Sequence, residues 1–230
     1  MNQVIFRRTL AAYRTRFIIC AVGITAWGLI LPVIYATFGK SLADALKGNP
    51  FLSQFTQFGG GDLFTLSGAI AIGFIHPFSV ALLAVFAVGF PIAAIAGERQ
   101  RGTLEVLLAR PVSRRSLYIT DFLVGMLFLG LMLALELTAN VVSSAAMGVL
   151  GEISVANMPI LWLNGWLLFV AFMAVGFAAS VSFDRVGPPL GITLAFLLIA
   201  YVIDVIASLW PDAKWIGEYS LFHYVKAKPV

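Results

Sequence analysis

One charged stretch divides this chain: Gly97-Glu98-Arg99-Gln100-Arg101-Gly102-Thr103-Leu104-Glu105-Val106-Leu107-Leu108-Ala109-Arg110-Pro111-Val112-Ser113-Arg114-Arg115. It holds five arginines and two glutamates, although only 11% of the 230 residues are charged. Long apolar runs at 75–96 and 117–135 lie on either side of it. Runs of this length are typical of membrane-spanning helices, so the charged stretch is interpreted as the surface loop that joins two of them.

The charged stretch itself contains the pattern of a short helix. Leu104, Leu107 and Leu108 lie at i, i+3 and i+4, which places them on one helical face. Thr103 is a candidate N-cap, Pro111 ends the helix, and Ser113 is a candidate cap for the following helix. A short amphipathic helix at a membrane surface, with arginines at both ends, is the simplest interpretation.

The composition predicts an all-α integral membrane protein. Hydrophobic residues make up 60% of the chain and the mean hydropathy is +0.96, whereas water-soluble domains are nearer half apolar and a quarter charged. We expect a single transmembrane domain over 1–230. The net charge of +4 is explained by arginines at span ends, so binding of nucleic acid is not expected. The single cysteine, Cys20, excludes an intrachain disulfide.

Five membrane spans are predicted from the apolar runs. They are residues 17–38, 75–96, about 116–150, 160–182 and 188–210. The first run is long for a secretory signal, so an uncleaved span is favoured over a signal cleaved near 41–43. His76-Pro77 divides the apolar residues 63–96, so that 63–75 is expected to be an interfacial or re-entrant helix. The polar residues 40–62 predict an external loop, and 211–230 predict an interfacial tail on the outer side.

The positive charges predict which side of the membrane each segment faces. All ten arginines fall in segments that this scheme places in the cytoplasm, and all five lysines fall in segments that it places outside. Because positive residues are enriched in short cytoplasmic loops, this division predicts a cytoplasmic N-terminus. Five spans then place the C-terminus outside.

The charged stretch resembles a segment of ABC-2 type transporter permeases with the pattern GER-x-x-GTLE…PVSRR. The match is carried by residues 97–105 and 110–115. The resemblance implies a cytoplasmic coupling helix after the second span, which docks on an ATP-binding subunit. The residues implied are Glu98, Arg99, Arg101, Gly102, Thr103, Leu104, Glu105, Leu107 and Leu108. The family generally has six spans, one more than this chain predicts, and a Gly-Lys pair where this chain has Thr120-Asp121-Phe122.

The sequence contains no motif for ATP hydrolysis. Its only Gly-Lys pair is Gly39-Lys40-Ser41, and Ile34 stands where a Walker A motif needs its first glycine. The H-E-x-x-H and G-x-S-x-G motifs are also absent. We therefore expect no enzyme activity and no cofactor in this chain, with ATP and magnesium bound by a partner subunit. His76, which precedes Pro77, is interpreted as a helix-boundary residue in preference to a metal or haem ligand.

Two carboxylates fall within predicted spans, where a charge is costly and usually faces the protein interior. Glu136 begins a polar stripe at i, i+4, i+7 and i+8. The stripe is Glu136, Asn140, Ser143 and Ser144. It either forms interhelical hydrogen bonds, with Glu136 protonated or paired, or lines a substrate path or an interface with a second permease. Asp204 lies near the outer end of the last span, where a snorkelling or locally paired carboxylate is favoured.

The sequence thus predicts the permease subunit of an ABC-2 type exporter in the cell membrane. By resemblance, two permease chains, identical or related, pair within membrane lipid and each docks one ATP-binding subunit. The cargo implied is amphipathic: a drug, a lipid or a glycan. One alternative is a secondary transporter driven by protons through Glu136 and Asp204. Another is a membrane scaffold that transports nothing.

Overall fold

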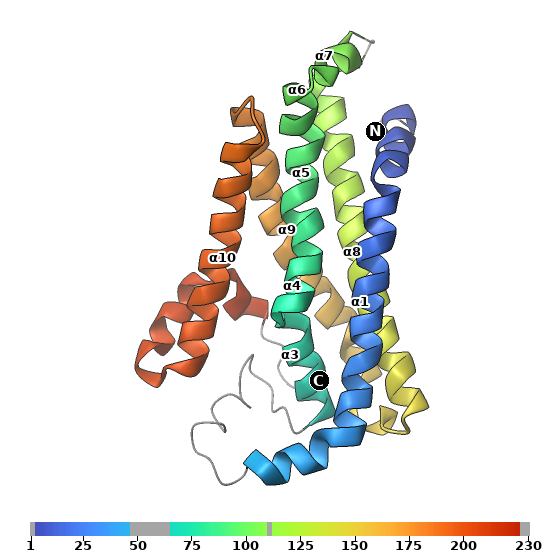
Figure 1. Cartoon of the computed structure of the whole chain (residues 1–230), viewed down its shortest axis with the longest axis vertical. Helices are drawn as coiled ribbons and strands as arrows, with labels where there is room; N and C mark the ends of the chain where they lie inside the picture. The colour runs from blue at the N-terminus through green and yellow to red at the C-terminus, as the bar shows by residue number, and fades with distance from the viewer. Residues whose placement is uncertain (1–2, 47–64, 110–111, 226–230) are drawn as a thin grey trace.

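The computed structural model describes residues 3–46, 65–109 and 112–225. Most of the predicted external loop, 40–62, and the pair Arg110-Pro111 lie outside these residues. Every regular element in the described part is a helix, and the long helices run side by side (Figure 1). Five stretches are long and apolar enough to cross a membrane. The prediction of an all-α protein with five spans is therefore confirmed.

The five candidate spans follow the predicted order along the chain. They are α1 (Gln3–Leu46), the composite stretch Pro77–Gln100, α8 (Arg114–Ala146), α9 (Met158–Ser182) and α10 (Gly187–Leu209). The helix α1 begins well before the apolar run at 17–38, because the arginine-bearing N-terminal residues continue it. The helix α8 ends at Ala146, earlier than predicted, and Gly148 follows with a φ of 72°. That left-handed conformation favours glycine and ends the helix.

The second candidate span is a composite helix. Its parts are α4 (Pro77–Ala84), a π-helical turn Val85–Gly89, α5 (Phe90–Ile92), a π-helical turn Ala93–Gly97 and α6 (Glu98–Gln100). Pro91 lies in α5, and its missing N–H removes one hydrogen bond of a regular α-helix. From α6 the chain passes through Arg101 and Gly102 into α7 (Thr103–Leu108).

The predicted helix break at His76-Pro77 is confirmed. The short helix α3 (Leu66–Ile75) ends at His76, whose extended backbone also starts α4. The Nδ1 atom of His76 accepts a hydrogen bond from the backbone N–H of Phe78 at 3.3 Å. His76 is therefore a helix-boundary residue, as predicted from its place before a proline.

The helices α1 and α8 lie side by side over much of their length (Figure 1). A Cβ atom added at Gly28 of α1 would lie 2.5 Å from the carbonyl oxygen of Glu136 and 3.0 Å from the Cβ of Ala139. Such a contact with backbone cannot be relieved by a side-chain rotation. Gly28 is thus required for the close approach of the two helices.

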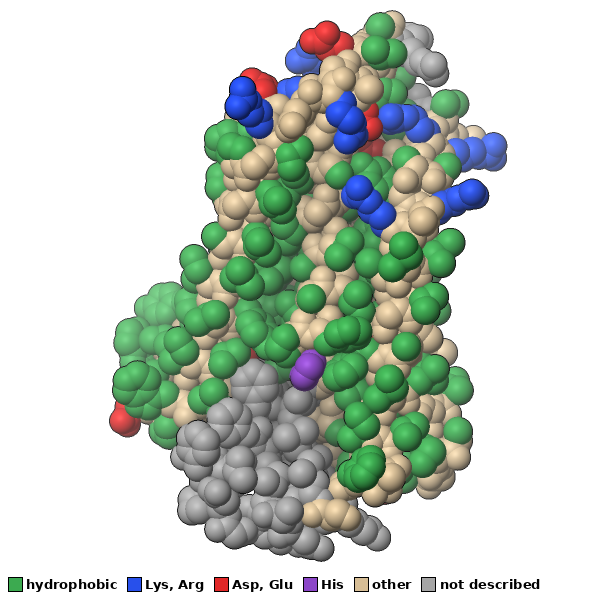
Figure 2. Space-filling view, viewed as in Figure 1, with side chains coloured by type: hydrophobic (Ala, Val, Ile, Leu, Met, Phe, Trp, Pro, Cys, Tyr) green, Lys and Arg blue, Asp and Glu red, His purple; other side chains and the backbone are tan. Residues whose placement is uncertain are grey.

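One end of the bundle carries the arginines. At this arginine-rich end lie the N-terminus of α1, the α6–α7 segment, the start of α8 and the turn between α9 and α10 (Figure 1). Figure 2 shows blue side chains, which at this end are arginines, gathered above a mostly hydrophobic face. This grouping follows from the sequence positions of the arginines and from the alternating directions of the helices.

The last described segment folds back on the bundle. It consists of two 3₁₀ helices, Pro211–Tyr219 and Leu221–Val225. Phe222 is 2% exposed and packs against Phe172 of α9 and Tyr201 of α10. Trp215 and Tyr219 remain exposed, consistent with the interfacial tail that the sequence predicted. The remaining short helices, Leu150–Glu152 and Val155–Asn157, form the turn between α8 and α9.

Candidate functional site

The predicted coupling helix is present as α7 and lies at the tip of the arginine-rich end (Figure 1). Its cap differs from the prediction. Gly102, with a φ of 72°, holds the N-cap position, and Thr103 is the first residue inside the helix. The reason is the sharp turn between α6 and α7, which needs a residue in the left-handed conformation. Glycine adopts this conformation without strain. The prediction that Thr103 caps the helix was wrong, whereas Ser113 caps α8 as predicted, at 3.1 Å from the Ser116 N–H.

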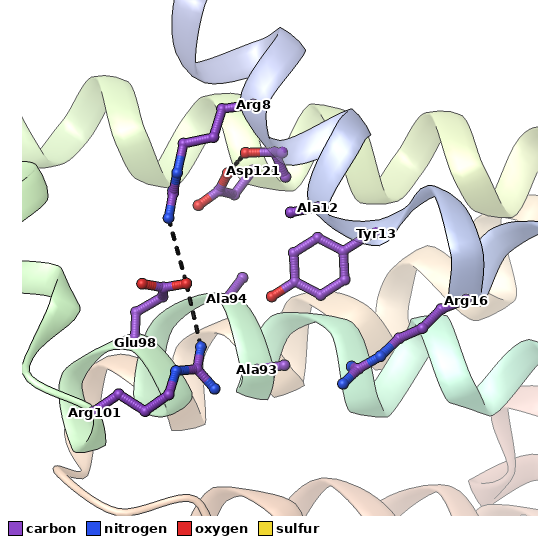
Figure 3. A pocket seen from close by; sticks show the side chains of 10 residues that line it. Arg8, Ala12, Tyr13, Arg16, Ala93, Ala94, Glu98, Arg101 and Asp121 are labelled. Atoms are coloured by element: carbon purple, nitrogen blue, oxygen red, sulfur yellow. Dashed lines mark hydrogen bonds and ion pairs between the residues drawn. The ribbon is translucent and has the colours of Figure 1, made fainter.

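Glu98 joins α1 to the α6–α7 segment. Its Oε1 atom lies 3.4 Å from Nη2 of Arg8 and 3.2 Å from Nη2 of Arg101 (Figure 3). The Thr103 hydroxyl bonds to the other carboxylate oxygen of Glu98. The side chain of Glu98 is only 15% exposed, so these contacts are partly shielded from water. One carboxylate therefore binds the start of α1, the turn at Arg101 and the first residue of α7.

Arg99 and Gln100 join α6 to the turn between α9 and α10. The Nη1 atom of Arg99 donates to the carbonyl oxygen of Phe183 at 3.0 Å and to Oδ1 of Asp184 at 3.2 Å. The first of these bonds satisfies a carbonyl group that the end of α9 leaves without a helical partner. The Oε1 atom of Gln100 accepts from the Val186 N–H, at the N-cap position of α10, at 2.9 Å. Adjacent side chains of α6 thus hold the C-terminal end of one span and the beginning of the next.

The leucine face of α7 turns partly toward the protein itself. Leu104 and Leu108 line a groove of about 560 Å³ together with Leu117 and Tyr118 of α8. Leu107 lines a smaller hollow near the N-terminal turn of α1. All three leucines are partly buried, whereas Val106 is 67% exposed. The apolar side chain that α7 presents most openly is therefore Val106, which the leucine pattern did not single out.

The predicted polar stripe of α8 lies inside the chain. Its four residues are between 0% and 5% exposed. The Ser143 hydroxyl donates to the carbonyl oxygen of Leu29 in α1 at 2.6 Å, and the Asn140 amide donates to the Glu136 carbonyl oxygen at 3.0 Å. The interhelical hydrogen bonding predicted for this stripe is thus found between α8 and α1. A role of the stripe in a cargo path stays a prediction.

Glu136 is connected to the helix break at His76-Pro77. The Ser79 hydroxyl lies 3.0 Å from Oε1 of Glu136 and 2.9 Å from the carbonyl oxygen of Gly73. Since Pro77 has no N–H, the Gly73 carbonyl loses its usual helical donor. Ser79 and the indole N–H of Trp27, at 3.0 Å, replace that donor. The buried polar side chains thus stabilise a broken helix.

The contacts of Ser79 bear on the protonation of Glu136. A serine hydroxyl carries a single proton, so it can donate to only one of its two neighbours. If Glu136 is protonated, it donates to Ser79, and Ser79 donates to Gly73. With Glu136 ionised, one of the two contacts has no proton. Both contacts can therefore be complete only where Glu136 supplies a proton of its own.

Asp204 is buried in α10 and is 3% exposed. Its helix packs against α9 and the C-terminal 3₁₀ segment, where the Ser220 hydroxyl donates to the Ala200 carbonyl oxygen at 2.6 Å. A carboxylate that snorkels to water would be exposed, so the local-contact alternative fits this position better.

Several residues of these contact groups were not predicted. They are Arg8, Gln100, Asp184, Trp27, Gly73 and Ser79. Most lie more than 40 residues from their partners in the sequence, so no local spacing of residues could predict these contacts. Thr9 and Asp121 form a further pair, with the Thr9 hydroxyl 2.7 Å from Oδ1 of Asp121. Thr120-Asp121 departs from the family pattern, and that departure was the one available signal for this pair.

The acidic, His and Cys side chains of the described residues do not group into a metal site. Within residues 3–46, 65–109 and 112–225, no three His, Cys, Asp or Glu side chains could hold a metal ion together. The contacts at the arginine-rich end are hydrogen bonds and ion pairs between helices. These contacts join the segment before α7 to three spans, α1, α9 and α10.

These features define a multi-pass helical membrane protein with a short surface helix, within a charged stretch, after its second span. Residues 14–214 match the family model described as ABC-2 family transporter protein. The chain belongs to this family, and it is a permease component of an ABC transporter, a transmembrane part that is not itself catalytic. The proton-driven alternative is not favoured by this membership. Searches of the curated proteins and of the solved structures found no match.

Proposed function

We propose that this permease exports an amphipathic cargo across the cell membrane, driven by ATP hydrolysis in a separate subunit. Family membership implies association with an ABC ATP-binding subunit. We propose that this subunit holds the ATP and magnesium and that the arginine-rich end faces the cytoplasm, consistent with the excess of arginine there. Two permease chains would pair, each with one ATP-binding subunit.

The observation that carries the proposal is the position and attachment of α7. This helix lies at the tip of the bundle (Figure 1). Its Val106 side chain is exposed. Directly before it, Glu98 is bonded to α1, while Arg99 and Gln100 are bonded to the α9–α10 turn. A partner that moves α7 would therefore move the ends of several spans together.

The mechanism follows from these contacts. When two ATP-binding subunits close on ATP, each would shift the α7 to which it is docked. Because α6 is held to α1, α9 and α10, the shift reaches the helices that would border the path between two permeases. This is a rigid-body transmission of the kind seen in allosteric proteins. No side chain of the permease needs to react chemically.

The test is a substitution on the exposed side of α7. Val106→Asp should weaken co-purification of the ATP-binding subunit by about tenfold, because burying a valine contributes roughly 1.5 kcal/mol and a buried carboxylate adds a desolvation penalty. Leu107→Asp should also weaken it, but Leu107 is partly buried in a hollow beside α1, so its loss would disturb folding too. Val106 is the cleaner probe because it is 67% exposed.

Val155→Asp is the matched control. Val155 is 45% exposed and lies in the α8–α9 turn, at the end of the bundle opposite α7. This variant should insert into the membrane normally, and the amount of ATP-binding subunit that co-purifies with it should be unchanged. If Val106→Asp retains both co-purification and cargo-stimulated ATP turnover at the parental level, α7 is only a surface anchor and the proposal fails.

A further inference from the structure

A hollow at the arginine-rich end lies between the start of α1 and the second span, and the permease function proposed above does not use it (Figure 3). Its volume is about 190 Å³. Small side chains, Ala12 of α1 with Ala93 and Ala94 of the second span, leave this space open. Charged side chains stand around it. They are Arg8, Arg16, Arg101, Glu98 and Asp121.

The charges around the hollow do not balance. Three guanidinium groups face two carboxylates, so the formal charge is +1. Arg8 and Arg101 share the same oxygen of Glu98, and the other oxygen of that carboxylate is bonded to Thr103. The Oδ1 atom of Asp121 accepts a bond from Thr9. One positive charge is therefore left for a ligand.

The hollow also contains hydrogen-bond donors that the protein leaves unused. In the described part of the chain, Arg16 makes no hydrogen bond or ion pair, and only its contact with the Tyr13 ring, 5.6 Å from the ring centroid, is present. The Tyr13 hydroxyl has no partner among these residues either, and it points into the hollow (Figure 3). Arg8 and Arg101 each give one N–H to Glu98 and have further N–H groups available. Converging donors with a net positive charge suit an anion with several oxygens, such as a phosphate.

Exposed apolar surface continues from the hollow along both helices. On α1, Ala12, Arg16 and Ile19 lie at i, i+4 and i+7, and Ile19 is 66% exposed. On the second span, Val85 and Gly89 precede Ala93 at intervals of four residues. Val85 is 42% exposed, and a Cβ atom at Gly89 would meet nothing within 4 Å. An apolar chain can therefore lie on this surface while a charged group occupies the hollow.

We propose that the hollow binds the phosphate of a membrane phospholipid, with the acyl chains on the apolar surface that includes Ile19, Val85 and Gly89. A free phosphate would use only the arginines and Tyr13. A phospholipid matches both halves of the surface, because it joins one anionic phosphate to long apolar chains. Arg16, on the same face of α1 as Ile19 and less than one turn away, stands at the boundary between the two halves.

The test measures binding of short-chain phosphatidylglycerol to the purified full chain by native mass spectrometry. Arg16→Gln should weaken binding by about tenfold, because it removes a charge-assisted hydrogen bond. Arg14→Gln is the matched control: it removes the same charge from the same helix at an exposed residue outside the hollow, and binding should not change. Tyr13→Phe should weaken binding by a smaller factor, since it removes only the hydroxyl.

Two further ligands separate the contributions of the lipid. Inorganic phosphate lacks the acyl chains, and short-chain diacylglycerol lacks the phosphate; each should bind at least about tenfold more weakly than phosphatidylglycerol. If either ligand bound as tightly as phosphatidylglycerol, the proposal would be overturned, because either the apolar surface or the hollow would then contribute nothing to binding. Equal losses in Arg16→Gln and Arg14→Gln would also overturn it, because they would indicate general attraction to positive charge. None of these measurements depends on an ATP-binding subunit.

Discussion

The arginine-rich end and the buried centre of the bundle are both polar, but different contacts hold them. At the arginine-rich end, Arg8, Arg99 and Arg101 bind carboxylates that water reaches at least in part. In the centre, Ser79 links Glu136 to the carbonyl of Gly73 within a fully buried contact. Water can replace a lost partner in the first region but not in the second. Equal chemical changes should therefore have unequal effects on stability.

The two regions also suit different tasks. Ion pairs between partly exposed side chains are weak individually, so several contacts together hold α6 to α1, α9 and α10. A buried hydrogen bond that satisfies a broken helix is costly to remove, so it fixes one arrangement of α3, α4 and α8. The permease thus combines an end held by several weak contacts, next to α7, with a fixed centre. Three substitutions test this difference, from the largest expected effect to the smallest.

Gly28→Val should have the largest effect, since it separates α1 from α8 in the fixed centre. The added side chain would collide with the backbone at Glu136 and should lower the free energy of unfolding by about 3 kcal/mol. Gly191→Val is the control, because a Cβ atom at Gly191 of α10 meets nothing within 4 Å. Thermal unfolding in detergent measures both. Equal unfolding temperatures for the two variants would show that α1 and α8 do not need this close approach.

Ser79→Ala should have an intermediate effect. It removes one of the donors to the Gly73 carbonyl and the hydrogen-bond partner of Glu136, and the loss should be about 2 kcal/mol. Ser182→Ala is the control, because the exposed Ser182 hydroxyl only bonds back to Ala178 of its own helix. The measurement is again thermal unfolding. A loss no larger than that of Ser182→Ala would mean that the buried contact is dispensable, and the contrast between centre and end would disappear.

Arg99→Ala should have the smallest effect on stability, about 1 kcal/mol or less, because Arg99 is 33% exposed and Asp184 is 89% exposed. The loss should shrink further in high salt, which screens the ion pair. Arg185→Ala, at an exposed neighbouring arginine in the same turn, is the control. Unfolding measured at low and high salt distinguishes the two. A large, salt-independent loss would place Arg99 with the fixed centre and contradict the comparison.

The helical content and the order of the spans could be predicted because they depend on local properties. Apolar runs of about 20 residues specify spans, and His76-Pro77 or Ser113 specify their ends, whatever the rest of the chain does. The arginine positions predicted which helix ends share one side (Figure 2). The family could be predicted from a short motif for the same reason, since residues 97–115 are contiguous.

The sequence alone thus determined the class of the protein, its spans and the place of α7, since each follows from neighbouring residues. Only the tertiary structure decided what the polar side chains contact. Glu98 binds Arg8 across 90 residues, Arg99 binds Asp184 across 85, and Ser79 contacts Glu136 across 57. Helix periodicity gives the face of one helix but not the helix that packs against it. For that reason the sequence placed Leu104, Leu107 and Leu108 on one face of α7, but only the structure showed that this face is partly buried while Val106 is exposed.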